Sequence, residues 1–163
     1  MNILVLCTGN SARSIMLESI FNHYGKGRVT AFSAGSNPTG IVHPNALALL
    51  SEKGLPTKSL RSKSWDEFSL AGAPEMDMVI TVCGNARDEV CPIWPGAPLT
   101  GHWGIDDPAA ITSSPKATRA AFEVAYSVLE ARAKAWLSLG FEDMAPEDHQ
   151  AEIDRVGDSM LVM

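Results

Sequence analysis

The chain has 163 residues, a net charge of −6, 45% apolar residues and 20% charged residues, which fits one globular domain with a full hydrophobic core. The acidic balance argues against nucleic-acid binding, and it means that a local site must capture any anionic substrate. No apolar run is long enough to span a membrane, and the first one, Asn2 to Cys7, lacks the basic flank of a signal peptide. We therefore expect a cytoplasmic monomer with no membrane or nucleic-acid partner.

Segments with strand patterns alternate with segments of helical periodicity. Short apolar runs without polar alternation, typical of buried parallel strands, predict strands at residues 2–7, 29–34, 78–83 and 99–105. Apolar residues at helical spacing predict helices at residues 15–24, 44–53, 65–70 and 114–139. The alternation predicts an α/β fold, a three-layer α/β/α domain with a four-stranded parallel sheet, over residues 1–140. Residues 141–163 are acidic and poor in apolar side chains, so we expect a partly ordered appendix without an assigned function.

The strongest functional signal lies between the first expected strand and the first expected helix. The segment reads Cys7-Thr8-Gly9-Asn10-Ser11-Ala12-Arg13-Ser14. Ligands of parallel α/β sheets bind at the carboxyl ends of strands, where backbone N–H groups beside a helix N-terminus form an anion cradle. Gly9 supplies the backbone freedom that such a cradle requires. The segment therefore predicts an oxyanion site.

Three side chains of this segment suggest chemistry. The helix N-terminus and Arg13 are expected to lower the pKa of Cys7, which would make it a thiolate at neutral pH. Arg13 can hold a tetrahedral oxyanion through two hydrogen bonds. Ser14 can donate a hydrogen bond to the Cys7 sulfur. The spacing alone would equally fit a buried cysteine and a surface arginine, but the flanking strand and helix favour the functional interpretation.

A cysteine followed by five residues and Arg-Ser resembles the phosphate-binding loop of the low-molecular-weight protein tyrosine phosphatases and of the arsenate reductases that share their fold. The resemblance implies that Cys7 is the nucleophile and that residues 8–14 bind the oxyanion. It also implies a general acid in a later Asp-Pro pair, for which we choose Asp107 before Pro108. Asp106 is the alternative acid that the sequence leaves open.

Two features separate the phosphatase branch from the reductase branch. Ala109-Ala110 follow the Asp-Pro pair, where the phosphatases usually carry aromatic residues. The segment from Cys83 to Cys91-Pro92 resembles the redox segment of the thioredoxin-coupled arsenate reductases, as does the later His102-Trp103-Gly104. A zinc site formed by Cys83, Cys91 and His102, and inert core cysteines, are the other interpretations, although the spacing lacks the close ligand pair of structural zinc sites.

The resemblance implies an enzyme that reduces arsenate to arsenite with three thiols. Cys7 attacks arsenate, Cys83 forms a disulfide with Cys7, and Cys91 receives that disulfide and passes it outward. Thioredoxin is the implied electron donor, and a glutaredoxin/glutathione route is the alternative. Other functions that the residues allow are a phosphomonoesterase, a module that binds oxyanions or arsenite, and a reversible redox sensor.

The resemblance also implies that a potassium ion can bind near the loop, and we expect that no cofactor is required. The matching positions are Asn10, Glu18, Ser33 and Asp66. All four side chains offer oxygen atoms, which suit a hard cation.

Overall fold

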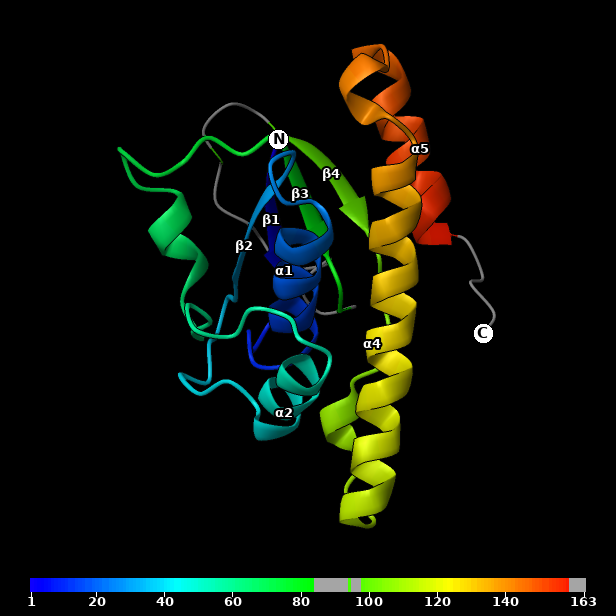
Figure 1. Cartoon of the computed structure of the whole chain (residues 1–163). Coiled ribbons are helices and arrows are strands. Elements are labelled where there is room, and N and C mark those ends of the chain that lie inside the picture. Colours follow the sequence, from blue (N-terminus) through cyan, green and yellow to red (C-terminus); the bar gives the residue numbers. More distant parts are fainter. Residues whose placement is uncertain (84–93, 95–97, 159–163) are drawn as a thin grey trace.

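The computed structural model describes residues 1–83, 94 and 98–158. Its centre is a parallel four-stranded sheet in the order β2-β1-β3-β4. The strands are β1 (Asn2–Leu6), β2 (Thr30–Ala34), β3 (Met78–Thr81) and β4 (Leu99–His102). The helices are α1 (Arg13–Tyr24), α2 (Pro44–Glu52), α4 (Pro115–Ser138) and α5 (Pro146–Asp158), with 3-10 helices η1 (Trp65–Phe68), η2 (Pro108–Ala110) and η3 (Phe141–Asp143). The predicted α/β fold is thereby confirmed (Figure 1).

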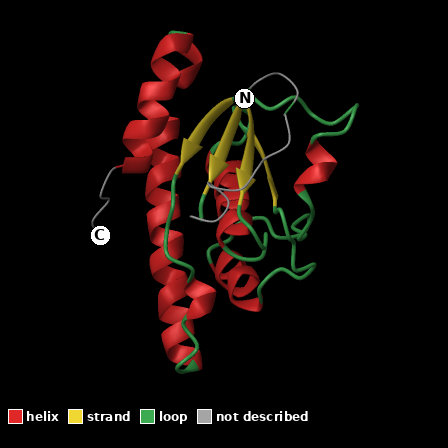
Figure 2. Ribbon diagram, turned by 180° about the vertical axis from the view of Figure 1, so that it is seen from behind, coloured by secondary structure: helices red, strands yellow, loops and turns green. Residues whose placement is uncertain are grey.

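Both faces of the central strands are buried, which explains why their sequences lack polar alternation. Ile3 and Val5 of β1 point into the main core, which α1 and α4 cover. Leu4 and Leu6 point to the opposite face, where they pack with Phe68 of η1. The strands of the sheet run side by side with α1 behind them, α2 lies below α1, and η1 lies apart from these helices (Figure 2).

The long helix α4 begins as its sequence predicts. The Ser114 hydroxyl accepts a hydrogen bond from the backbone N–H of Ala117, and proline occupies the first helical position. Its apolar face, including Phe122 and Leu129, packs on the main core. None of the described helices is long and apolar enough to cross a membrane.

Residues 141–163 were expected to form a partly ordered appendix, and the structure adds a helix to the described part of this segment. Within its described part lies α5, which packs against β4 and α4 (Figure 1). Ile153 is fully buried, and its carbonyl accepts a hydrogen bond from the Trp103 indole at 3.0 Å. A side chain at Gly101 would lie 2.2 Å from Ile153, so this glycine permits the helix to dock on the sheet edge. The sequence concealed the helix because only Ile153 and Val156 of its side chains are buried.

The loop that follows β1 lies where the order of the strands in the sheet changes direction. The chain leaves β1 for β2 on one side and later returns to β3 on the other side of β1. Crevices for ligands open at such points, at the carboxyl ends of the strands. Cys7 follows β1 directly and Cys83 lies shortly after β3, so the parallel pairing of these neighbouring strands brings both cysteines to one edge.

Candidate active site

The loop after β1 is held from outside through its carbonyl groups. Thr8 O accepts a hydrogen bond from the N–H of Asn37 at 3.0 Å. Gly9 O accepts from the N–H of Thr39 at 3.1 Å and from the Ser62 hydroxyl at 3.2 Å. Ser11 O likewise accepts a backbone hydrogen bond, and the residue at the N-cap of α1, Ala12, makes no side-chain cap hydrogen bond. Because the carbonyls are bound outward, the loop can turn its N–H groups to the inside, as an oxyanion cradle requires.

Asn10 and Gly35 make the tight turn of this loop possible. Asn10 has a φ of 43°, a left-handed conformation that asparagine tolerates better than most residues. Its amide donates hydrogen bonds to Ser14 Oγ at 2.8 Å and Ser33 Oγ at 3.0 Å, which fixes this conformation. A side chain at Gly35 would lie 2.4 Å from the carbonyl oxygen of Thr8, so only glycine allows the end of β2 to approach the loop.

Arg13 connects the loop to the segment that carries the expected acid. Its Nη1 donates a hydrogen bond to the carbonyl oxygen of Ile105 at 3.0 Å, and its Nη2 lies 3.7 Å from Asp107 Oδ2. Asp107 also caps η2 by accepting a hydrogen bond from the Ala109 N–H. Among the described ion pairs, Arg13 has none with the exposed Asp106. The geometry therefore favours Asp107 over Asp106 as the residue beside the oxyanion site.

Cys7 and Cys83 are both free thiols and both buried, and they lie beside each other where the neighbouring strands β1 and β3 end. The Cys83 sulfur also accepts a hydrogen bond from the backbone N–H of Thr8 at 3.3 Å. A second thiol thus lies against the expected nucleophile and uses one N–H group of the loop. The N–H that would face an oxyanion is bound to sulfur in this arrangement.

This contact reverses the expected ionisation of Cys7. The hydrogen bond with Cys83 and burial raise the pKa of Cys7 well above its usual value, whereas Arg13 and the N–H of Gly9 lower it. Cys7 is therefore a neutral thiol at pH 7 while Cys83 lies beside it. The expectation of a thiolate considered the helix N-terminus and Arg13 alone and could not include a sulfur from another strand.

Of the other predicted residues, Ser14 and His102 are described by the structure and Cys91 is not. Ser14 is fully buried and accepts the hydrogen bond of Asn10, and among the described residues it makes none to the Cys7 sulfur. His102 Nδ1 lies 2.7 Å from the Thr81 hydroxyl. Cys91 lies outside the described residues, so neither the redox segment nor a zinc site with Cys83 and His102 is tested. Thr8 to Ala12 connect β1 to α1, and Arg13 and Ser14 are the first two residues of α1. Oxyanion binding by residues 8–14 stays a prediction.

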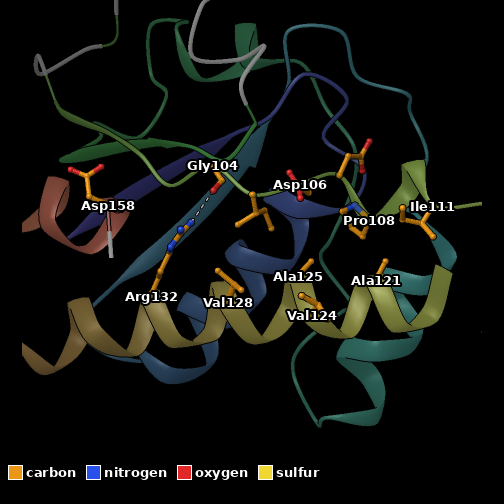
Figure 3. A pocket seen from close by; sticks show the side chains of 13 residues that line it. Gly104, Asp106, Pro108, Ile111, Ala121, Val124, Ala125, Val128, Arg132 and Asp158 are labelled. Atoms are coloured by element: carbon orange, nitrogen blue, oxygen red, sulfur yellow. Dashed lines mark hydrogen bonds between the residues drawn. The ribbon is translucent and has the colours of Figure 1, made fainter. Parts of the chain in front are cut away.

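A pocket of about 720 Å³ lies behind the acid segment, between residues 104–111 and the face of α4 (Figure 3). Its walls are largely apolar, with Val124 and Val128 on one side and Pro108 on the other. Arg132 crosses the pocket to donate a hydrogen bond to the carbonyl oxygen of Gly104 at 3.2 Å (Figure 3). The Nε of Arg132 is buried and has no partner among the described residues. The segment with Asp107 is thus held by Arg13 on one side and by Arg132 on the other.

Sequence reasoning missed several residues that shape the site. Gly35 follows a predicted strand in a Ser-Ala-Gly-Ser run, a signal of close backbone approach that could have been used. No local pattern marks Ser62 or Lys63 as part of the site, because the loop residues that they contact lie 53 positions earlier in the chain. Arg132 was not predicted, because it is one of several charged residues in the long helix α4.

Comparison with known proteins identifies the class to which this site belongs. The family model for low molecular weight phosphotyrosine protein phosphatase matches residues 2–150, and the chain belongs to this family. An arsenate reductase of Shouchella clausii (strain KSM-K16) is 33% identical over 138 residues, which are 85% of this chain and 96% of that protein.

Solved structures of two enzyme classes resemble the fold. The arsenate reductase of Archaeoglobus fulgidus DSM 4304 has a TM-score of 0.64 and 28% identity, covering 83% of this chain and 98% of its own. The Erwinia amylovora tyrosine phosphatase AmsI has a TM-score of 0.63 and 26% identity, covering 84% and 91%. Because both classes share the fold, the residues of the site must separate them.

Proposed function

We propose that this protein is an arsenate reductase. The observation that carries the proposal is the position of the buried Cys83 thiol, whose sulfur lies 3.3 Å from the Thr8 nitrogen, in the residue that directly follows Cys7. A second thiol in contact with the nucleophile is what reduction requires, and phosphate ester hydrolysis does not use it. The similarity to the Shouchella clausii arsenate reductase supports the same choice.

The proposed reaction begins at the loop. Arsenate binds to the N–H groups of residues 8–14, and Arg13 holds two of its oxygens. The Cys7 thiolate attacks arsenic and forms a sulfur–arsenic bond. The departing hydroxide takes a proton from Asp107 and leaves as water, because hydroxide alone is a poor leaving group. The 3.7 Å separation of Arg13 and Asp107 supports this division of roles.

Reduction then proceeds by thiol exchange. Cys83 as a thiolate attacks the Cys7 sulfur, a disulfide forms, and the electron pair of the sulfur–arsenic bond passes to arsenic, which leaves as arsenite. Cys91 attacks Cys83 and releases Cys7 as a thiolate. An external dithiol reduces the resulting Cys83–Cys91 disulfide and restores three thiols. Thioredoxin is the donor we expect, with glutaredoxin and glutathione as the alternative.

Substrate binding would also activate the nucleophile. Arsenate competes with the Cys83 sulfur for the N–H of Thr8, which donates to that sulfur at 3.3 Å before substrate binds. Once Cys83 leaves this position, the largest cause of the raised Cys7 pKa is gone, while Arg13 still lowers it. The Cys7 pKa should therefore fall when the substrate is present, although burial still raises it. Cytoplasmic location and a monomeric state stay predictions.

The test is arsenate-dependent NADPH oxidation in the presence of thioredoxin and thioredoxin reductase, run beside hydrolysis of an aryl phosphate. Wild type, Cys83→Ala and Cys91→Ser are compared in both assays. We expect arsenate turnover by the wild type and its loss in both variants, because each step of the relay needs the next thiol. Replacing thioredoxin with glutaredoxin and glutathione identifies the donor.

The same assays can overturn the proposal. Aryl phosphate hydrolysis that is indifferent to both substitutions, without arsenate turnover with either donor, would assign the protein to the phosphatase branch. Arsenate or phosphate binding without any turnover would leave an oxyanion-binding module. Reversible oxidation of Cys83 and Cys91 without arsenate turnover would leave a redox sensor.

A further inference from the structure

Five buried polar side chains lie directly beneath the oxyanion loop. They come from the loop, α1, β2 and the segment before η1, and we call them the buried polar cluster: Asn10, Ser14, Glu18, Ser33 and Lys63. Three of these residues, with Asp66, are the positions at which a potassium ion was expected. The contacts of these side chains therefore decide whether a potassium ion fits here.

The side-chain oxygens of Asn10, Ser14 and Ser33 and one oxygen of Glu18 already take part in hydrogen bonds. Asn10 turns its amide nitrogen to Ser33 and Ser14, and its Oδ1 accepts a hydrogen bond from the backbone N–H of Lys63 at 2.9 Å. Ser33 donates its hydroxyl hydrogen to Glu18 Oε1 at 2.5 Å. Asp66 is exposed at the start of η1, and among the described residues it makes no hydrogen bond to the cluster. These four side chains do not fit a potassium ion, which needs several oxygens directed at one point.

A cation from the chain itself occupies the position beside the carboxylate. The Lys63 Nζ lies 3.6 Å from Glu18 Oε1, and the exposed fractions of the two side chains are 7% and 9%. Lys63 Nζ also donates a hydrogen bond to the carbonyl oxygen of Arg61 at 3.0 Å. An added potassium ion would have to approach a buried ammonium group at close range, where repulsion is weakly screened.

Lys63 acts on the loop through two of its groups. Its backbone N–H holds the Oδ1 of Asn10, and its ammonium group balances Glu18, which in turn holds Ser33 and through it the amide of Asn10. Asn10 is the residue with the left-handed backbone that turns the loop. The charge pair thus supports the conformation on which the cradle depends.

We propose that Lys63 is a built-in counter-ion that takes the place of a bound monovalent cation, so that the order of the oxyanion loop and its anion binding do not depend on potassium. Lys63 is a positioning residue, because it contacts the loop and not the oxyanion. The proposal requires only that the loop bind a tetrahedral oxyanion, so it stands apart from the reductase proposal and would hold for a phosphatase too.

The first experiment uses the unmodified protein. Melting temperature and the Kd for inorganic phosphate are measured in about 0.1 M potassium chloride and in choline chloride of the same ionic strength, so that screening is equal. We expect both quantities to be the same in the two salts. A saturable rise in melting temperature or phosphate affinity with potassium would overturn the proposal, whichever reaction the enzyme catalyses.

The second experiment removes the built-in charge. In Lys63→Met the carboxylate of Glu18 loses its partner and the support of the loop is weakened. We expect phosphate affinity in choline to fall by about tenfold. Added potassium should restore part of this affinity and raise the melting temperature of this variant. The double variant Lys63→Met/Glu18→Gln has no charge to balance and should not respond to potassium.

Lys58→Met is the matched control, because Lys58 is an exposed lysine in the same segment. It should bind phosphate as the wild type does in both salts. Phosphate binding by Lys63→Met that equals the wild type in both salts would contradict the proposal. If Lys63→Met does not fold, Lys63→Arg, which keeps the charge, should bind phosphate independently of potassium, and a potassium requirement in Lys63→Arg would contradict it.

Discussion

The two halves of the site are built differently. The loop of residues 7–14 is bound by backbone hydrogen bonds from the 37–43 segment and rests on the buried polar cluster. The segment of residues 104–111 has an exposed Asp107, lies beside an open pocket and is held to the protein body by Arg13 and Arg132. The oxyanion is therefore received by a fixed structure, whereas the acid is placed by two long side chains.

This difference assigns different tasks to the two halves. Preorganised N–H groups stabilise charge without reorganisation, so the loop gains from being rigid. An acid that must approach a leaving group after the substrate binds can be carried by a segment with fewer attachments. Substitutions in the support of the loop should thus affect oxyanion binding. A substitution of Arg132, which holds the acid segment and not the oxyanion, should affect kcat alone.

The largest effect is expected for Gly35→Ala, which tests the fixed half. The added methyl group would lie 2.4 Å from the carbonyl oxygen of Thr8 and 2.7 Å from that of Cys7, so the loop must move. Displacement of a preorganised site by a fraction of an ångström to one ångström costs about 100-fold in kcat/KM. Phosphate affinity measured by calorimetry and arsenate turnover should both fall.

Gly54→Ala is the control for a general loss of stability. Gly54 has a φ of +77° with open space around it, so alanine there is strained but touches nothing near the site. Its phosphate affinity should remain that of the wild type. Unchanged phosphate binding in Gly35→Ala would show that the loop adapts, and the contrast between the two halves would then be wrong.

The next effect concerns ionisation within the loop. In Cys83→Ala the contact that contributes most to raising the pKa of Cys7 is absent, so the Cys7 pKa should fall. Because the thiolate reacts with iodoacetamide and the thiol does not, the pH profile of Cys7 alkylation should move to lower pH. A shift of one unit gives about a tenfold faster reaction at pH 7.

Mass spectrometry of the labelled peptides separates Cys7 from Cys91 in this experiment. Cys91→Ser, which leaves the Cys7–Cys83 contact in place, is the comparison variant. An alkylation profile of Cys7 that is equal in wild type, Cys83→Ala and Cys91→Ser would show that Cys83 does not govern the ionisation of the nucleophile.

The same contrast explains what the sequence could predict. The loop motif and the strand pattern are local, so Cys7, Arg13 and the parallel sheet follow from neighbouring residues. The raised pKa of Cys7 depends largely on Cys83, a residue far along the chain whose sulfur also binds the Thr8 N–H, and no local pattern encodes this proximity. The sequence did not predict α5, because the helix has few apolar residues and because its packing depends on Gly101 in β4.

A smaller effect is expected for Arg132→Met, which tests the half that carries the acid. The variant loses the hydrogen bond to Gly104, so Asp107 should be placed less well and kcat should fall about three- to tenfold, comparable with the loss of one hydrogen bond. Phosphate affinity should not change. Stability should remain or rise slightly, because a buried guanidinium with an unpartnered Nε is replaced by an apolar side chain.

Arg155→Met provides the comparison for Arg132→Met, since Arg155 lies on the surface of α5 and pairs only with Glu152 among the described ion pairs. Its kcat should equal that of the wild type. A loss of phosphate affinity in Arg132→Met as large as that in Gly35→Ala would mean that the acid segment also shapes the oxyanion site, and the two halves would not be separable.

The smallest effect is expected for Ser62→Ala, although Ser62 contacts the loop directly. Its hydroxyl donates to Gly9 O at 3.2 Å, but the same carbonyl also accepts a hydrogen bond from the Thr39 N–H at 3.1 Å. The carbonyl therefore keeps a partner in the variant, and the loss should be about 1 kcal/mol or less in stability and less than about threefold in phosphate Kd. Chemical denaturation and calorimetry measure both. A loss of phosphate affinity as large as that in Gly35→Ala would mean that the loop conformation depends on each single hydrogen bond. A small loss is expected because several hydrogen bonds together hold the loop.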